Sequence, residues 1–290
     1  MNRKITCTNE DGVQLTLTSR FLSFLLQHCD GIYGFKVNNA ISDNTMTDGG
    51  THQGAVVMVR NIVLTIADKE KHQDNRELVY KCFKPNSIGT FVYEENEKKR
   101  QIEYYVEDVD FDSVKNVRVG TISLKCTDPF FSELEDVAIM MAGWKGAFHF
   151  RHAFKVGGEP FGYRVRERLK EVKNDSAADN IGITVRVTTL GNVTNPAIVH
   201  VEKGERIAIG SDAVPFVMNP GDILEITTGV NNKHIYLTRN GVREEINYYL
   251  TEDSEFIQLS RGINTIGYEA AAGEEHMTVE IMFRYKYLGV

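Results

Sequence analysis

The feature that most constrains this chain is a succession of short β-rich runs separated by turn residues, most regular after residue 146. The runs there include IGITVRVTTL, ILEITT, HIYLT and MTVEIMFRYKY. Asn240-Gly241 is a pair typical of a tight hairpin, and Asn219-Pro220-Gly221-Asp222 forms a turn before the next run. Short strands at close spacing, joined by such turns, predict a β-sandwich.

The first half is also β-rich, but it contains one helix pattern. ITCTN and VQLTLT read as an opening hairpin, and GAVVMVRNIVLTIAD is the strongest strand signal. Apolar pairs four residues apart follow Asp74, and Pro85 ends that pattern, so a helix is expected there. Residues 91–106 are expected to form an extended hairpin. The polar, Gly-rich stretch 43–54 fits either a mobile arm or a surface connection.

The length of 290 residues favours two domains. The strand rhythm pauses after Asp128-Pro129 and restarts at Ala147. We therefore expect a mainly β protein with two β-sandwich-like domains. The expected division is residues 1–130, a linker with a short helix at residues 131–146, and residues 147–290.

Charge and cysteine usage exclude several classes of protein. The formal net charge is -7, so the chain is not expected to hold DNA. The four cysteines are scattered, with no pair at metal-binding spacing, and we expect reduced thiols and no disulfide. The polar start predicts no cleaved leader, and no apolar run is long enough to insert into a membrane.

No motif in the sequence supports catalysis, a cofactor or a metal. The patterns of nucleophile elbows, zinc proteases, P-loops and dinucleotide-binding turns are all missing from it. His149 and His152 lie three apart in a β-rich run, where they would point to opposite faces. Acidic residues around 94–112 favour a solvated face over a calcium loop. We expect no enzyme.

The main alternative is a carbohydrate-binding module. A β-sandwich can present aromatic rings to sugars, and the best candidates for such a platform are Tyr163, Tyr236 and Tyr248. Core or interface packing is the commoner use of such side chains. A hydrolase would need a pocket with paired carboxylates.

The order of segments in the first half resembles the N-terminal half of siphophage distal tail proteins. GAVVMVRNIVLTI carries an internal Arg60, RELVYKCFKP ends in Phe-x-Pro, and a hairpin follows. VGTISLKCTDPFF then closes with Cys126, Asp128, Pro129 and Phe130. The second half is similar to the family's C-terminal galectin-like sandwich, with Gly191-Asn192, Gly221-Asp222 and a close made by Leu259, Gly262 and Asn264.

The resemblance implies a structural role in a virion. Distal tail proteins form a ring, typically a homo-hexamer, between the tail tube protein and the tail-tip proteins, and DNA passes through the ring without being bound. The outer domain can hold a receptor-binding protein. Such a protein assembles in the cytoplasm of the bacterial host and ends at the tail tip.

The hairpin at residues 91–106 is the expected ring contact. Two-stranded hairpins are marginal alone, and aromatic residues are enriched in interfaces. The candidate ring residues are Phe91, Tyr93, Ile102, Tyr104 and Tyr105. The alternative, a hairpin folded onto its own domain, stays open at this point.

Overall fold

The computed structural model describes residues 3–19, 24–44, 46, 48–68, 72–112, 118–146 and 162–290. The chain forms two compact units. Unit 1 comprises Met1–Leu134 and Lys286–Val290, and unit 2 comprises Glu135–Tyr285. Unit 2 is therefore inserted between two parts of unit 1, and the chain passes between the units twice.

Unit 1 is built on one sheet that returns on itself. Its hydrogen-bonded order is β25-β10-β8-β7-β1-β2-β3-β6-β9, with a further pairing between β8 and β9. The long strand β8 makes this closure, because its first part pairs with β7 and its last part pairs with β9; the β8–β9 register shifts between Val106 and Asp108. The strands are β1 (Arg3–Asn9), β2 (Gln14–Thr18), β3 (Leu25–Asp30), β6 (Arg60–Asp68), β7 (Ile88–Glu95), β8 (Lys98–Phe111), β9 (Arg118–Cys126), β10 (Phe131–Ser132) and β25 (Lys286–Tyr287).

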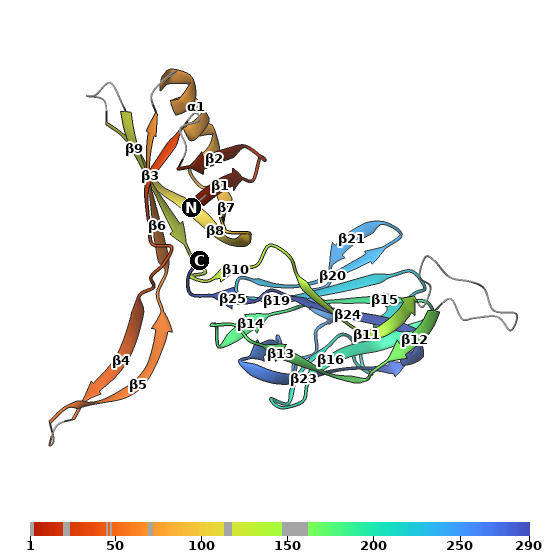
Figure 1. Ribbon diagram of the computed structural model, residues 1–290. Helices are drawn as coiled ribbons and strands as arrows, with labels where there is room; N and C mark the ends of the chain where they lie inside the picture. The colour runs from red at the N-terminus through yellow and green to blue at the C-terminus, as the bar shows by residue number, and fades with distance from the viewer. Residues whose placement is uncertain are drawn as a thin grey trace, which may run out of the picture. The chain divides into compact units, whose positions relative to one another are not determined.

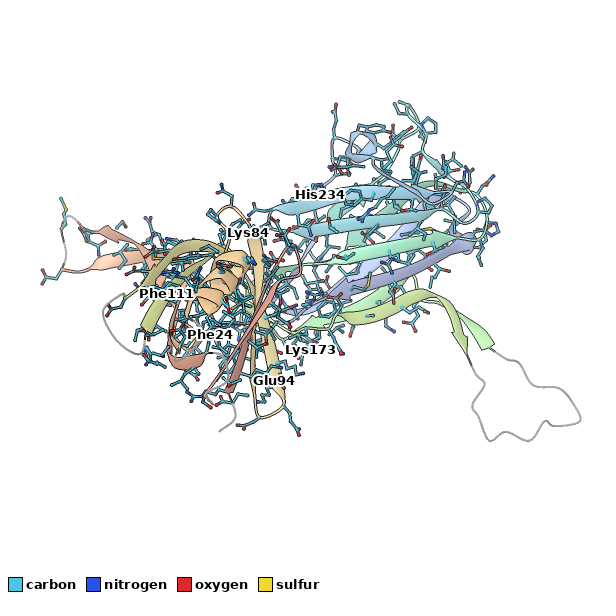
Figure 2. The ribbon with its side chains drawn as sticks, turned by 90° about the horizontal axis from the view of Figure 1, so that it is seen from above. Phe24, Lys84, Glu94, Phe111, Lys173 and His234 are labelled. Carbon is cyan, nitrogen blue, oxygen red and sulfur yellow. The ribbon has the colours of Figure 1, made fainter. Side chains whose placement is uncertain are left out.

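The interior of unit 1 follows from alternation along these strands. In β6, Ile62, Leu64 and Ile66 are fully buried, and the residues between them face outward or are half-buried. The helix α1 (His72–Cys82) turns Val79 and Cys82 into the same core. Lys84, labelled in Figure 2, follows the helix and pairs with Asp11 in the turn between β1 and β2.

One hairpin of unit 1 stands apart from this sheet. Strands β4 (Val37–Asp43) and β5 (Gly50–Val57) pair only with each other among the described strands. Their register shifts between Ala40 and Ile41. Figure 1 shows the hairpin as a long arm that leaves unit 1 between β3 and β6.

Unit 2 is a β-sandwich. Its larger sheet has the order β12-β11-β24-β15-β19-β20-β21, and its smaller sheet has the order β13-β23-β16-β17, with β18 joined to β16. The larger sheet has one buried face, as the alternating burial of β19 and β24 shows. A further pair joins β14 and β22. His234, labelled in Figure 2, lies on β20 of the larger sheet.

The bounds of the elements of unit 2 are as follows: β11 (Val137–Gly146), β12 (Gly162–Arg166), β13 (Leu169–Asn174), β14 (Asn180–Gly182), β15 (Thr184–Thr189), β16 (Val193–His200), β17 (Glu205–Ala208), β18 (Val217–Met218), β19 (Ile223–Gly229), β20 (Asn232–Arg239), β21 (Val242–Glu245), β22 (Gln258–Ser260), β23 (Gly262–Ala272) and β24 (Met277–Phe283), with short 3-10 helices at Asn247–Tyr249 and Glu274–His276.

The expected mainly β fold is confirmed, and so is the single helix of the first half. The expected linker is wrong. Residues 131–146 contain no helix among the described residues; they contribute β10 to unit 1 and the ten-residue strand β11 to unit 2. The apolar run Val137–Met141 reads equally well as helix or strand, and pairing with β24 decides for strand.

Candidate assembly surface

The β4–β5 hairpin presents apolar side chains to solvent on both of its faces. Val56 is 65% exposed and Ile41 is 63% exposed, although both lie on paired strands. More apolar residues continue this surface to the base of the hairpin. The exposed apolar set is Phe35, Val37, Ile41, Val56, Met58 and Val59, which we call the hairpin surface. Contiguous exposed apolar groups of this kind mark interaction sites.

The hairpin also lacks the devices that keep strands from pairing with other chains. Between Lys36 and Arg60 the only charged residues are Asp43 and Asp48, and there is no proline. Edge strands that remain free in a monomer usually carry lysine, proline or a covering loop. A long, nearly uncharged hairpin with two free edges therefore suits contact with another protein chain.

A mostly apolar cavity of about 430 Å³ lies at the base of the hairpin. The hairpin surface supplies Phe35, Met58 and Val59 to it, and the rest of the lining is formed by Gly31, Gly34, Lys36, Arg60, Asn61 and Pro129. Mostly apolar walls with a few cationic groups can receive an apolar side chain and a nearby acceptor. The cavity and the hairpin surface thus share three residues at the base of the hairpin.

Arg60 holds the base of the hairpin in place. The side chain of Arg60 is buried, with 5% of the residue exposed. Its guanidinium donates hydrogen bonds to the carbonyl oxygens of Gly31, Gly34, Pro129 and Leu288. Burial lowers the pKa of this guanidinium. Four carbonyl acceptors offset much of the cost of burying the charge, and they tie three separate segments to β6.

The candidate ring residues predicted from the sequence lie elsewhere. Phe91, Tyr93, Ile102 and Tyr104 are all buried in the core of unit 1, and only Tyr105 is substantially exposed, at 40%. The hairpin that carries them is β7–β8, which is an integral part of the closed sheet. Four of these five side chains are therefore covered within their own unit, because β7 and β8 are paired inside the closed sheet.

The structure also places the candidate sugar platform. Tyr236 lies between the Arg243 guanidinium, 3.9 Å from the ring centroid, and the His234 ring, which stacks at 5.5 Å. Both contacts occupy the ring, so little of its face is left for a sugar. Tyr248 is 69% exposed and packs on Tyr249. Tyr163 lies on β12 opposite Lys145. Among the described side-chain contacts, none links Tyr236 with Tyr248.

Other expected sites remain without support in the described part of the chain. No group of histidine, cysteine, aspartate or glutamate residues there is arranged to hold a metal ion. His149 and His152 lie outside the described residues. The described helices include none of the length and apolarity that a membrane crossing requires.

Comparison with known proteins was made by sequence and by structure. No family model and no curated protein matches the sequence. The crystal structure of the Dit protein of phage SPP1 has a TM-score of 0.65 and 16% identity, over 98% of this chain and 99% of that chain. The chain has the SPP1 Dit fold.

Two further solved structures have the same fold over their whole length. A chain of the phage P2 baseplate in its activated conformation with calcium has a TM-score of 0.56 and 10% identity, over 100% of both chains. The corresponding baseplate structure with strontium has a TM-score of 0.55 and 11% identity, over 100% of this chain and 99% of that chain. The SPP1 Dit protein is a paradigm of the hub adsorption apparatus of phages that infect Gram-positive bacteria.

Proposed function

We propose that this chain is a distal tail protein, a structural hub at the tip of a phage or prophage tail. The observation that carries the proposal is the agreement of fold over 98–100% of the chain with a phage hub protein and with baseplate chains. Both units take part in that agreement, and in the same order along the chain. The sequence resemblance to the same family supports it independently.

Several copies of the chain form a closed ring, and the hairpin surface is the contact between neighbours. A ring requires a heterologous contact in which two different patches meet. The hairpin provides one projecting patch. Its exposed valine and isoleucine side chains become buried only when a second chain covers them. A homo-hexamer is the expected closure, with the tail tube protein on one side and tail-tip proteins on the other.

Charge agrees with a conduit that DNA crosses without being held. The net charge is -7, and Asp108 and Asp110 on β8 are exposed. Like charges repel phosphates, whereas a basic channel would bind them and release counterions. The role is structural, and it places the protein at the virion tail tip after assembly in the host cytoplasm.

The carbohydrate-binding alternative has no specific observation in its favour. The covered ring of Tyr236 argues against it, and a single exposed Tyr248 is not a platform. A glycan array probed with the purified protein is expected to show no binding. Binding that Tyr248→Ala removes would favour the lectin function instead.

The direct test is the size and shape of the purified protein. Mass photometry across nanomolar to micromolar concentrations, followed by negative-stain microscopy, is expected to show a ring with a central hole. Replacing residues 38–56 by a short Gly-Asn turn should give monomers with an unchanged β-type circular dichroism spectrum. Wild-type protein that stays monomeric at every concentration, even with a tail tube protein present, would contradict the proposal.

A further inference from the structure

The segment after unit 2 returns to unit 1 and binds to a set of side chains there that we call its seat. β25 pairs with β10, with Tyr287 opposite Phe131. The Arg100 guanidinium stacks over the Tyr287 ring at 3.7 Å and also donates to the carbonyl of Gly289. The Tyr287 hydroxyl donates to Glu133. In Figure 1 the end marked C lies beside β10. We call residues 286–290 the return segment.

The return segment also contacts the base of the β4–β5 hairpin. The amide of Val290 donates to the carbonyl of Ile32 at 3.3 Å. Gly289 lies so close to this backbone that an added Cβ would be 3.2 Å from the carbonyl oxygens of Ile32 and Tyr33. Arg60 donates to Leu288 with the same guanidinium that holds Gly31 and Gly34. The seat therefore joins the return segment to the root of the hairpin.

Unit 2 controls how easily the return segment finds this seat. When unit 2 is folded, β11 pairs with β24 and Val137 lies opposite Phe283. An ion pair of 2.6 Å between Arg284 and Asp136 joins the residues next to this pair, at the two ends of unit 2. Folded unit 2 thus brings the two ends of its own insertion together. In an unfolded unit 2, the connection from Leu134 to Lys286 is a flexible loop of 151 residues, since unit 2 runs from 135 to 285.

We propose that the return segment is a latch that fixes the root of the hairpin, and that folding of unit 2 closes this latch. Shortening the effective loop from about 150 residues to about six raises the local concentration of the latch on the order of a hundredfold, by the three-halves power of loop length. A chain whose unit 2 has not folded therefore keeps a loose hairpin. Any effect of the latch on ring assembly rests on the proposed function. The effect of the latch on the order of the hairpin root does not.

Trypsin offers a specific readout of the hairpin root. No lysine or arginine lies between Lys36 and Arg60, so cleavage after Lys36 reports on this root alone. Three variants of the full chain are compared with wild type: deletion of residues 286–290, Gly289→Val, and Gly34→Ala. Gly34→Ala is the matched control, because an added Cβ there meets no atom within 4 Å. Hydrogen exchange of β6 and β9 verifies that unit 1 stays folded in each variant.

The latch predicts that cleavage after Lys36 is at least tenfold faster in the deletion and in Gly289→Val, and unchanged in Gly34→Ala. A synthetic peptide of residues 286–290, added at millimolar concentration, should slow cleavage of the deletion variant again. Val185→Asp, which unfolds the core of unit 2, should speed cleavage as the deletion does. Equal cleavage rates in wild type and Gly289→Val overturn the latch. A monomeric wild type contradicts the ring instead, and the cleavage rates still decide the latch.

Discussion

A charge placed at the centre of the hairpin surface should prevent assembly without unfolding the monomer. Val56 is 65% exposed, so Val56→Lys puts an ammonium into solvent in the isolated chain. Such surface changes alter the free energy of unfolding by about 0.5 kcal/mol or less. In a ring the same side chain would have to be buried against a neighbour.

The size of the effect follows from the exposed fraction. Complete burial of a valine stabilises by about 1.5–3 kcal/mol, so covering the remaining 65% contributes about 1–2 kcal/mol per contact. Burying an unpaired lysine costs at least about 1–2 kcal/mol more, because the penalty is larger for charged groups than for neutral ones. The total of at least about 2–4 kcal/mol weakens each contact by at least roughly 30- to 700-fold.

The assay is mass photometry of wild type and variant over a concentration series, with urea unfolding of each as the measure of stability. Val242→Lys is the matched control, because Val242 is 69% exposed on strand β21 of unit 2. The control should assemble as wild type does. If Val56→Lys forms rings at the wild-type concentration, the hairpin is not the contact between copies.

Four further outcomes are expected. Ile102→Ala should lower the stability of unit 1 by about 2–5 kcal/mol in urea unfolding, because Ile102 is 3% exposed in its core; a value below 1 kcal/mol would contradict that placement. Hydrogen bonds from Thr265 lower the pKa of Glu202 in the folded protein. The contribution of Glu202 to the free energy of unfolding is therefore present above the unfolded-state pKa of about 4.3, and it is lost as the pH falls through the lower folded-state pKa. Glu202→Gln should therefore cost about 0.5 kcal/mol at pH 7, a small value for a carboxylate that is 45% exposed, and less as the pH falls below the unfolded pKa. Burial raises the pKa of Cys29 and Cys126 to about 12 and that of Cys82 to about 11, so a thiol reagent at pH 8 should react only after denaturation, then with four thiols; fewer would indicate a disulfide. A single protease cut between Leu134 and Glu135 should leave both fragments bound in gel filtration, since the return segment stays in unit 1; fragments that separate would argue against the seat.

Sequence reasoning succeeded where local pattern decides the structure. Alternation in ILEITT and MTVEIMFRYKY predicts half-buried strands, and β19 and β24 have that burial. The helix after residue 71 was likewise predictable from apolar pairs four residues apart and from Pro85. Composition and these patterns were enough for the mainly β fold.

Long-range pairing is where sequence reasoning failed. Nothing local in β8 indicates that its last part leaves β7 and pairs with β9, yet that closure buries Phe91, Ile102 and Tyr104. The true projecting hairpin has a weak signal because Asn, Ser, Thr and Gly replace most apolar residues between 38 and 54. That stretch was open to interpretation as an arm, and the lack of lysine and arginine across it was the available clue.

The point at which unit 2 is inserted has a consequence for how such proteins can diversify. Entry and exit lie on neighbouring strands, since Ser132 of β10 is opposite Lys286 of β25. An inserted domain of any size can occupy that position if its own two ends lie about one strand spacing apart, roughly 5 Å. Lineages could therefore exchange or enlarge unit 2 by recombination while unit 1 keeps its geometry. The same junction offers engineers a place to graft a foreign domain, or to close unit 1 with a short Asn-Gly turn.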